Sequence, residues 1–396
     1  MLKFTDITVW PKKHLRDVCI IDPSKKETNG LDLNTKVSFG MMADLGEHRR
    51  VFSPKGVKVL HEVQKGGYSY FKTNDVLLAK MTPCFENGKS GIAQNLKSNI
   101  GFGSTEFYVI RPKGGLDPNL LYYYISSDKF INEGKFNLVG TTGRRRLLRQ
   151  FVELFEIPIP PDEEQKHIVS LFQSIEKVIE HLDYQIQNLT SLKKQILRDL
   201  FSITPKIGNY LTKRDFEPVR FEKLALNISE RVEPKETNLD TYVGLEHLDS
   251  DCLTIERTGK PEDVIGTKLK IYKGDIIFGK RRAYLRKVAV SHFDGIASAH
   301  SMILRANVHN IEKDFLPYFM QSDTFMERAV QISEGSLSPT IKWKTLAAQE
   351  FVLPKKEKQS IIIEIFKQFD NTTNLIQKQI STLRTLKQNL LNEILG

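Results

Sequence analysis

The sequence predicts an α+β protein with a pseudo-two-fold internal repeat: two globular α/β units, each followed by a long helix, and the two helices paired as an antiparallel coiled coil. Three observations carry this prediction. One apolar pattern occurs twice, a proline-containing stretch precedes each copy, and shorter motifs upstream are also duplicated. The strand-like runs are short and do not alternate regularly with helices, which favours α+β over a doubly wound sheet.

The length and the amino-acid composition fit a globular protein of two or more domains. The chain has 396 residues, of which 40% are hydrophobic and 27% charged, and its formal net charge is +10. A basic surplus favours a polyanionic partner such as nucleic acid, although many soluble proteins also carry surplus lysine. Cys19, Cys84 and Cys252 lie far apart, so we expect no disulfide framework and no thiolate zinc site, and a reducing cytoplasm fits. No run is apolar enough to predict a signal peptide or a membrane span.

The apolar pattern identifies the two long helices. With a shift of 194 residues, Pro160 falls on Pro354 and Gln165 on Gln359, and the apolar residues that follow agree in steps of three and four. Such steps form the seam of a coiled coil, whereas the alternative is an ordinary core-facing helix in each half. The seam positions that we expect to form the helical spacer are Ile168, Ile175, Leu182, Leu189 and Ile196 in the first copy, and Ile362, Phe369, Ile376, Leu383 and Leu390 in the second.

The segment before the first helix predicts a stiff joint. In "IPIPPDEEQ" the three prolines require extended backbone and cannot enter a helix interior. Asp162 is expected to be the N-cap residue, with Gln165 as its capping-box partner. Each helix would run roughly 38 residues, or about 57 Å, a length comparable to about 17 base pairs of DNA. Lys193 and Lys387 break the apolar seam at the same step of the two copies.

The repeat continues upstream of the helices. "YFKTNDVLLAKMTP" resembles "IYKGDIIFGKRRAY", which aligns Asp75 with Asp275 and Lys80 with Lys280. "GSTEFYVIRP" likewise resembles "ASAHSMILRA". We therefore place a first globular unit at 1–157, a central helix at 158–203, a second globular unit at 204–352 and a C-terminal helix at 353–396. The stretch "SITPKIGNYL" is expected to turn the chain into its second half.

Motifs for catalysis are missing. "NGKSG" lacks the earlier glycine of a phosphate-binding loop, and "GFG" at 101–103 is not followed by a third glycine. The histidines show no metal-binding spacing. We find no Asn-Pro-Pro-aromatic motif for methylating a base amino group and no convincing nuclease cluster. The sequence therefore predicts a protein that binds and positions, with no catalytic residue, metal or cofactor of its own.

A basic stretch with one aromatic residue is the first candidate for DNA binding. "GKRRAYLRK" follows a strand-like run in the second half. Arginine can donate two hydrogen bonds to guanine in the major groove, and any of these cations can contact phosphate. The alternative is a solvated charged loop. The candidates are Lys280, Arg281, Arg282, Tyr284 and Arg286.

A second candidate lies before each helix joint. "GTTGRRRLLRQF" in the first half and "EGSLSPTIKWK" in the second combine small or hydroxylated residues with cations, which suits close approach to phosphate. The alternative is a turn leading into a core helix. The candidates are Thr141, Thr142, Arg144, Arg145 and Arg146 in the first half and Ser336, Ser338, Lys342 and Lys344 in the second, together with Lys80 because it aligns with Lys280.

The order of these features resembles the specificity subunits of type I restriction-modification systems. The resemblance rests on the "IPIPPDEEQ" joint, the heptad helix after it, and their repetition after a second unit. "GDIIFGKRRAYLRKVAVSHFDGIASAHSMILRAN" is similar to a target-recognition domain of that family. The second copy departs where "LPKKEKQ" replaces "IPPDEEQ", which leaves a symmetric contact to two modification subunits open.

The resemblance implies a non-catalytic subunit for DNA sequence recognition. Its two target-recognition domains would each read one half of a split, asymmetric site in double-stranded DNA, and its helices would fix the gap. The implied partners are two modification subunits, which use S-adenosylmethionine to methylate adenine, and restriction subunits, which use ATP and Mg; no membrane is implied. The alternatives are a coiled-coil interaction scaffold without a DNA role, and a DNA methyltransferase or nuclease with an unrecognised motif.

Overall fold

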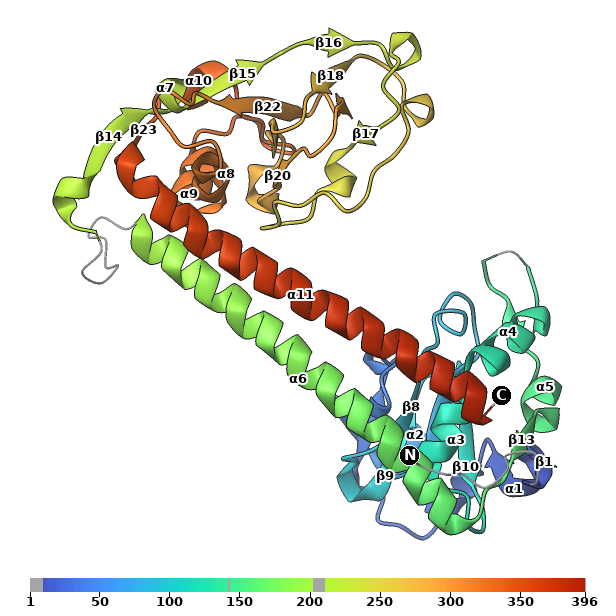
Figure 1. Ribbon diagram of the computed structural model, residues 1–396. Coiled ribbons are helices and arrows are strands. Elements are labelled where there is room, and N and C mark those ends of the chain that lie inside the picture. The colour runs from blue at the N-terminus through green and yellow to red at the C-terminus, as the bar shows by residue number, and fades with distance from the viewer. Residues whose placement is uncertain (1–9, 142, 202–210, 396) are drawn as a thin grey trace. The chain divides into compact units, whose positions relative to one another are not determined.

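The computed structural model describes residues 10–141, 143–201 and 211–395. The chain forms two compact units, of which the first consists of Met1–Leu182 with Lys378–Gly396 and the second of Asp183–Gln377. The dividing points fall inside the long helices α6 (Asp162–Leu200) and α11 (Lys356–Leu395), so each helix contributes to both units (Figure 1). The domain boundaries expected from the sequence treat these helices as separate segments, and they stay a prediction.

Two sheets build the first unit. One has the strand order β2-β10-β7-β8-β4 and the other the order β5-β3-β9-β6, and β1 pairs with β13 and β11 with β12 outside them. The strands are β1 (Lys12–His14), β2 (Cys19–Ile21), β3 (Lys36–Gly40), β4 (Val51–Phe52), β5 (Gly56–Val59), β6 (Ser69–Lys72), β7 (Val76–Ala79), β8 (Ser90–Ala93), β9 (Ile100–Gly103), β10 (Phe107–Pro112), β11 (Leu138–Val139), β12 (Arg146–Leu147) and β13 (Glu156–Pro158).

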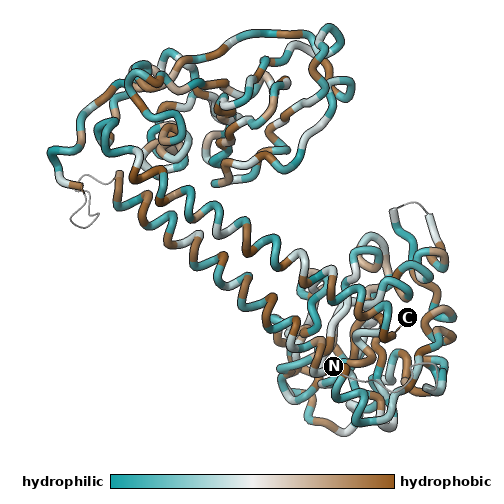
Figure 2. Tube along the Cα trace, viewed as in Figure 1, coloured by the Kyte–Doolittle hydropathy of each residue, from teal (hydrophilic) through white to brown (hydrophobic). Residues whose placement is uncertain are grey.

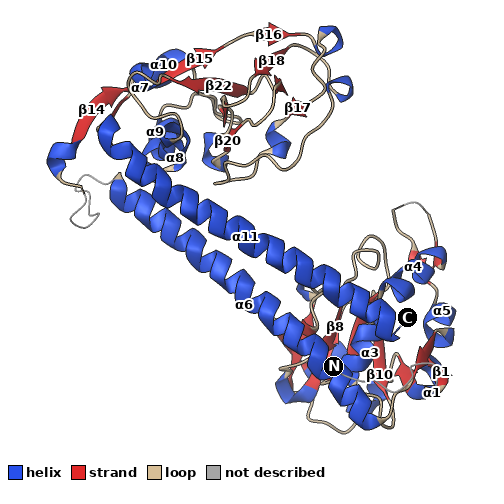
Figure 3. Ribbon diagram, viewed as in Figure 1, coloured by secondary structure: helices blue, strands red, loops and turns tan. Residues whose placement is uncertain are grey.

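Short helices accompany these sheets (Figure 3). They are α1 (Leu15–Val18), α2 (Leu60–Gln64), α3 (Pro118–Ile125), α4 (Asp128–Phe136) and α5 (Arg149–Leu154). The largest core of the first unit joins α3 and α4 to both long helices, because Tyr123 and Phe130 share it with Phe172 of α6 and Ile394 of α11. Phe172 and Phe130 are fully buried, which makes the helix ends part of the globular core.

The second unit has the same plan. Its sheets have the orders β15-β22-β19-β20 and β16-β18-β21-β17, and β14 pairs with β23. The strands are β14 (Phe216–Arg220), β15 (Ala225–Ile228), β16 (Arg231–Val232), β17 (Tyr242–Val243), β18 (Lys268–Ile271), β19 (Ile276–Gly279), β20 (Val288–Val290), β21 (Gly295–Ala297), β22 (Ser301–Ala306) and β23 (Glu350–Pro354), and the helices α7 (Phe221–Leu224), α8 (Phe315–Gln321), α9 (Asp323–Gln331) and α10 (Trp343–Ala347).

An ion pair between an arginine and a buried aspartate occurs at equivalent places in the two units. In the first, Arg111 donates two hydrogen bonds of 2.7 Å to Asp75. In the second, Arg305 donates bonds of 2.7 and 2.9 Å to Asp275. Both aspartates are almost fully buried. The pseudo-two-fold α+β repeat predicted from the sequence is confirmed, because β2-β10-β7-β8 corresponds to β15-β22-β19-β20 and β3-β9-β6 to β17-β21-β18, whereas the edge strands β4, β5 and β16 have no counterpart.

The central strands are buried on both faces, which explains their continuous apolar sequences. In β7, Val76 and Leu78 face the core that contains the helices, whereas Leu77 and Ala79 face the core between the two sheets. This alternation follows from the two-residue period of a strand. In β9 of "GFG", a Cβ on Gly101 would lie 2.0 Å from the Phe71 ring, so this glycine serves packing and forms no phosphate loop.

The two long helices are antiparallel within each unit. In the first unit, Ile168 near the start of α6 shares a core with Leu391 near the end of α11. In the second, Leu197 near the end of α6 shares a core with Ile362 near the start of α11. Apolar and polar residues alternate along both helices (Figure 2). All ten positions assigned to the helical spacer are buried or half-buried.

The capping box expected at the start of α6 is wrong. The amide of Gln165 donates to the carbonyl of Pro161, so Pro161 occupies the N-cap position. The Gln165 side chain instead donates to the carbonyls of Pro160 and Gly115 at 3.0 Å and accepts from the amide of Asp117 at 2.9 Å. The Asp162 carboxylate at the first helical position still interacts favourably with the positive end of the helix dipole.

The joint before each long helix is a strand. Before α6, β13 pairs with β1, and before α11, β23 pairs with β14. Gln359 holds the second joint as Gln165 holds the first, because it donates to the carbonyl of Pro354 at 2.9 Å and accepts from the amide of Glu312 at 2.8 Å. The joint is therefore stiff, as expected, although pairing of the backbone contributes as well as proline.

The lysines that interrupt the apolar seam form one polar layer in each unit. In the first, Lys387 of α11 pairs with Glu176 of α6 at 2.7 Å, and its ammonium lies 5.4 Å from the centre of the Tyr123 ring. In the second, Lys193 of α6 pairs with Asp370 of α11 at 2.5 Å and lies 5.2 Å from the Tyr318 ring. A carboxylate and an aromatic ring thus stabilise each lysine ammonium at a seam position where an apolar residue is expected.

Most of "SITPKIGNYL", which we expect to turn the chain into its second half, lies outside the described residues. Among the described helices, none combines the length and the hydrophobicity that crossing a membrane requires.

Candidate nucleic-acid interface

The structure brings Lys80 and the candidate stretch of the first unit together. The segment at 144–147 pairs with the residues that follow β7: the amide of Leu147 donates to the carbonyl of Lys80 at 2.8 Å, and the amide of Thr82 donates to the carbonyl of Arg145 at 2.9 Å. Met81 and Arg146 form a β-bridge between them. Lys80 and residues 144–146 therefore lie on one surface although more than sixty positions separate them in the chain. We call these residues the first basic surface.

The second unit has an equivalent surface. The amide of Ile341 donates to the carbonyl of Lys280 at 3.0 Å, and the amide of Arg282 donates to the carbonyl of Pro339 at 2.8 Å. Arg281 and Thr340 form a β-bridge. Residues 280–282 and 338–340 are called the second basic surface. The same backbone pairing in both units shows that the repeat extends to the candidate sites.

Acidic side chains partly neutralise the first basic surface. Arg146 donates to both carboxylate oxygens of Glu106, at 2.9 and 2.6 Å, and Arg145 donates to Glu86 at 3.1 Å. Lys80 donates to the carbonyl of Thr105 at 3.3 Å and lies 4.5 Å from the Tyr108 ring centre. Burial is the main cause that lowers the pKa of Lys80. Of the other candidates here, Thr141 and Arg144 are exposed, and Thr142 lies outside the described residues.

The second basic surface has no acidic partner among the described residues. No hydrogen bond or ion pair joins the half-buried Lys280 ammonium to them, and burial, with a smaller effect of Arg231, lowers its pKa. Arg281 lies 3.2 Å from the Nε2 atom of His300, and Arg282 contacts the hydroxyl of Ser338 at 3.4 Å. These cations keep N–H donors that can bind the acceptor atoms of a ligand. Phosphate and guanine both offer such acceptors.

The remaining candidates of the second unit are less closely grouped. Tyr284 is 53% exposed on the short turn after Arg282. Ser336 and Lys344 are exposed, and Lys342 pairs with Glu334 at 2.6 Å. These side chains can reach a ligand, and Lys342 is linked to the second basic surface through Glu334, whose backbone pairs with that of Thr340.

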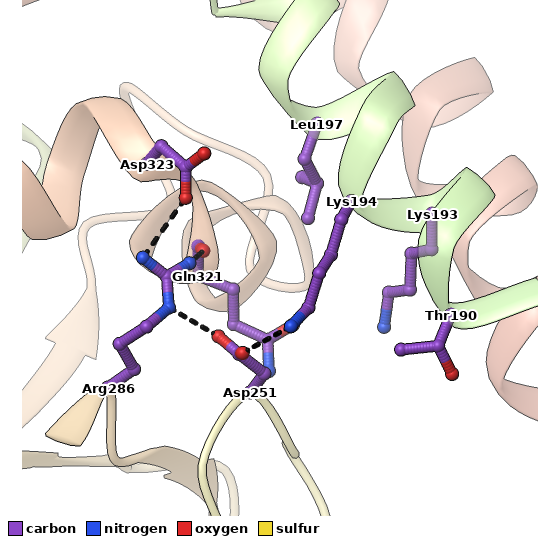
Figure 4. A pocket seen from close by; sticks show the side chains of 8 residues that line it. All are labelled: Thr190, Lys193, Lys194, Leu197, Asp251, Arg286, Gln321 and Asp323. Carbon is purple, nitrogen blue, oxygen red and sulfur yellow. Dashed lines mark hydrogen bonds and ion pairs between the residues drawn. The ribbon is translucent and has the colours of Figure 1, made fainter. Parts of the chain in front are cut away.

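Arg286 points toward Asp251 and Asp323 (Figure 4). It donates to Asp251 at 2.6 Å and to the carbonyl of Gln321 at 2.6 Å, and it pairs with Asp323 at 3.1 Å. Lys194 of α6 pairs with the same Asp251 at 2.8 Å. Arg286 therefore ties the loop to the helices of the second unit, and we do not include it in the second basic surface.

Sequence reasoning missed Glu106 and His300. Each immediately precedes a strand that pairs with the strand ending just before the candidate lysine, since Phe107 pairs with Ala79 and Ser301 with Gly279. The pKa of His300 is lowered by burial first and then by Arg281, Lys280 and Lys268, as expected of a strongly positive surrounding. The signal was present in the alignment of "GSTEFYVIRP" with "ASAHSMILRA", which places a glutamate opposite a histidine.

Comparison with known proteins agrees with the internal repeat. The family described as "Type I restriction modification DNA specificity domain" matches residues 9–191 and again 244–385. The specificity subunit of the type I restriction enzyme EcoEI from Escherichia coli is 34% identical over 184 residues, which are 46% of this chain and 30% of that protein. The corresponding subunit of EcoAI from the same organism is 32% identical over 212 residues, 52% of this chain and 34% of that protein. The chain thus matches only about a third of the length of these two relatives.

Solved structures share the fold. A chain from a structure entitled "Structural basis underlying complex assembly and conformational transition of the type I R-M system" matches with a TM-score of 0.62 and 18% identity, over 97% of both chains. The S subunit of a type I restriction-modification system from M. genitalium matches with a TM-score of 0.52 and 16% identity, over 100% of this chain and 98% of the other. Together with the double family match, these findings confirm the resemblance stated from the sequence, and the chain belongs to the family of type I restriction-modification DNA specificity proteins.

Proposed function

We propose that this chain is the DNA sequence-recognition subunit of a type I restriction-modification complex, non-catalytic itself, and that its two units each read one half of a bipartite, asymmetric DNA site. The observation that carries the proposal is the duplicated basic surface, in which Lys80 and Lys280 occupy equivalent places beside a strand-like segment rich in cations or hydroxyls. The family membership supports it, because relatives are named specificity subunits of type I restriction enzymes.

The proposed partners follow from what the chain lacks and what its family implies. Modification subunits, two in number, would carry S-adenosylmethionine and methylate adenine, and restriction subunits would supply ATP- and Mg-dependent cleavage. This chain would contribute recognition and a scaffold. Within the part of the chain that the structure describes, no group of three His, Cys, Asp or Glu residues is placed to hold a metal ion.

The test is a triple charge removal, Lys280→Ala with Arg281→Ala and Arg282→Ala, in the complex with modification subunits. We expect weaker DNA binding and a shallower dependence of log K on log salt, by about one unit for each phosphate that the variant no longer neutralises. The matched control removes the same charge at three exposed lysines outside both basic surfaces, Lys223, Lys235 and Lys260. Binding and methylation by the triple variant equal to those of the control would contradict this role for the second basic surface.

A second measurement separates recognition from catalysis. The purified chain is incubated alone with DNA, S-adenosylmethionine and magnesium, and methylation and cleavage are followed. We expect neither, and we expect methylation of a defined bipartite sequence once the modification subunits are added. Modification or cutting by the isolated chain would favour an enzyme instead.

A further inference from the structure

The two basic surfaces carry different chemistry on the same backbone frame. Four places are equivalent by strand pairing: Lys80 corresponds to Lys280, Met81 to Arg281, Glu106 to His300 and Arg146 to Thr340. Only the lysine is retained. A carboxylate is present at these places in the first unit alone, and the arginine lies on a different segment in each unit.

In the first unit, acceptor and donor groups stand side by side. Arg146 holds Glu106 through both carboxylate oxygens, and this hydrogen bond is the main cause that lowers the pKa of Glu106, which keeps the carboxylate charged. A carboxylate has about four lone-pair positions, so each oxygen can accept one more hydrogen bond. The Arg146 side chain is 62% exposed, and its guanidinium keeps N–H groups that Glu106 does not use.

This pair matches one pattern in the major groove. A C·G base pair presents the amino hydrogen of cytosine N4 beside the acceptors O6 and N7 of guanine. Glutamate accepts from cytosine N4, and arginine donates to guanine. The contact between Glu106 and Arg146 fixes the two groups relative to each other before DNA arrives, so less side-chain freedom is lost on binding.

In the second unit, donors dominate. Lys280 and Arg281 have no carboxylate partner among the described residues, and Arg281 Nη1 lies within hydrogen-bond distance of His300 Nε2. Thr340 stands where the first unit has Arg146. A surface that offers donors without a carboxylate suits guanine, whose major-groove edge offers two acceptors, O6 and N7.

We propose that Glu106, positioned by Arg146, reads a C·G base pair in one half of the DNA site, whereas Lys280 and Arg281, with His300, read a guanine in the other half. The inference rests on the proposed function and adds to it the residues that make the two half-sites different. Glu106 and His300 are then determinants of specificity, and Arg146 positions Glu106.

The test uses the complex of the full chain with its modification subunits and sequences the methylated sites. We expect Glu106→Gln to lower the preference for cytosine at one position of one half-site by ~10-fold and to admit adenine there, because glutamine pairs with adenine N6 and N7. Glu106→Asp should retain more of the preference. The matched control is Glu153→Gln, which removes a carboxylate paired with Arg149 at 2.7 Å outside both surfaces and should leave the methylated sequence unchanged.

A second variant tests the other unit. Arg281→Met introduces the residue that occupies the equivalent place in the first unit. We expect the preference for guanine to fall by ~10-fold at one position, and that position must belong to the half-site that Glu106→Gln leaves intact. Two variants that alter the same half-site would overturn the assignment.

The remaining outcomes are also decisive. An unchanged methylated sequence in both variants contradicts the inference while the proposed function stands. Loss of all binding by Glu106→Gln contradicts it too, whether the melting temperature is kept or lowered, since Glu106 would then maintain the surface and read no base. Failure of the unaltered complex to recognise any DNA sequence would instead remove the proposed function.

Discussion

Gln165 and Gln359 make the same two contacts at the start of the two long helices. Each donates to the carbonyl of a proline five positions earlier. Each also accepts from a backbone amide in the loop before a short helix, that of Asp117 before α3 or that of Glu312 before α8. Both side chains are almost fully buried. A buried amide that loses its only partner carries the cost of its own desolvation, so these glutamines fix how each helix leaves its unit.

We expect Gln165→Ala to lower the stability of the first unit by about 1–3 kcal/mol, because the Asp117 amide and the Pro160 carbonyl lose their partner. The free energy of unfolding is measured by urea titration, with hydrogen exchange of the α3 amides as the readout for the first unit. Glu180→Ala, at an exposed position of α6 within the first unit, is the control and should change little. Equal stability of the two variants would show that the glutamine joint is dispensable.

The ion pairs of Asp251 predict a dependence of stability on pH. Burial raises the pKa of Asp251, but its bonds to Arg286 and Lys194 outweigh burial and leave the pKa below 3.8. The folded state therefore binds a proton less readily than the unfolded state, and the stabilisation is present above about pH 4 and lost as the pH falls further.

The melting temperature of the second unit should thus differ most between the natural chain and Asp251→Asn near neutral pH, and the difference should shrink below about pH 4. Thermal unfolding across about pH 3–7 checks this. Asp249→Asn, which removes a more exposed partner of Arg257, should show a smaller difference at every pH. A difference for Asp251→Asn that persists at low pH would mean that altered packing, and not the missing charge, is responsible.

At the residue scale, sequence reasoning succeeded where the repeat supplied a second copy. Lys80 carries no signal alone, yet its alignment with Lys280 located the equivalent place in both units. Arg286 shows the limit, because its partners Asp251 and Asp323 come from segments that only folding brings near. The roles of the candidate side chains toward DNA stay predictions.

At the scale of elements, the long helices were the easiest to predict and their joints the hardest. A seam of period 3.5 is visible in sequence because every position of it is local. The pairing of β13 with β1 joins Pro158 to Lys12, and no local pattern announces such a distant partner. The same holds for the acids opposite Lys193 and Lys387, each of which lies on the other helix.

The polar layer of the second unit predicts a charge-reversal experiment. Lys193→Asp should destabilise the unit, because two carboxylates would then face each other beside Tyr318. The double variant Lys193→Asp with Asp370→Lys should recover part of the stability, since an opposite pair is restored. Thermal unfolding of the four proteins of this cycle gives the coupling, for which we expect about 0.5–3 kcal/mol. A coupling near zero would mean that the layer contributes nothing specific.

At the scale of the whole molecule, the spacer role of the helices becomes a prediction about DNA. Inserting one heptad into α6 within residues 168–200, and a matched heptad into α11, keeps the seam in register and adds about 10 Å of helix. The permitted gap between half-sites should then grow by about three base pairs. Methylated-site sequencing reads the gap directly. An active complex with its original gap would show that the helices do not set the spacing.

The repeated architecture was predictable because the same motifs occur twice in the sequence, and the domain boundaries drawn from them stay a prediction. Local patterns do not show that the ends of the long helices join the globular cores, as Phe172 and Ile394 join the core of the first unit. Burial depends on tertiary contacts that a local pattern does not contain.

The placement of Ile394 has a consequence for how the protein is made. The core of the first unit is completed by Leu391, Ile394 and Leu395. These residues leave the ribosome after the entire second unit. The first unit to be translated is therefore the last to close, and until then Phe172 and its neighbours lack part of their cover. Apolar surface that stays uncovered in this way is prone to aggregation while the second unit is being made.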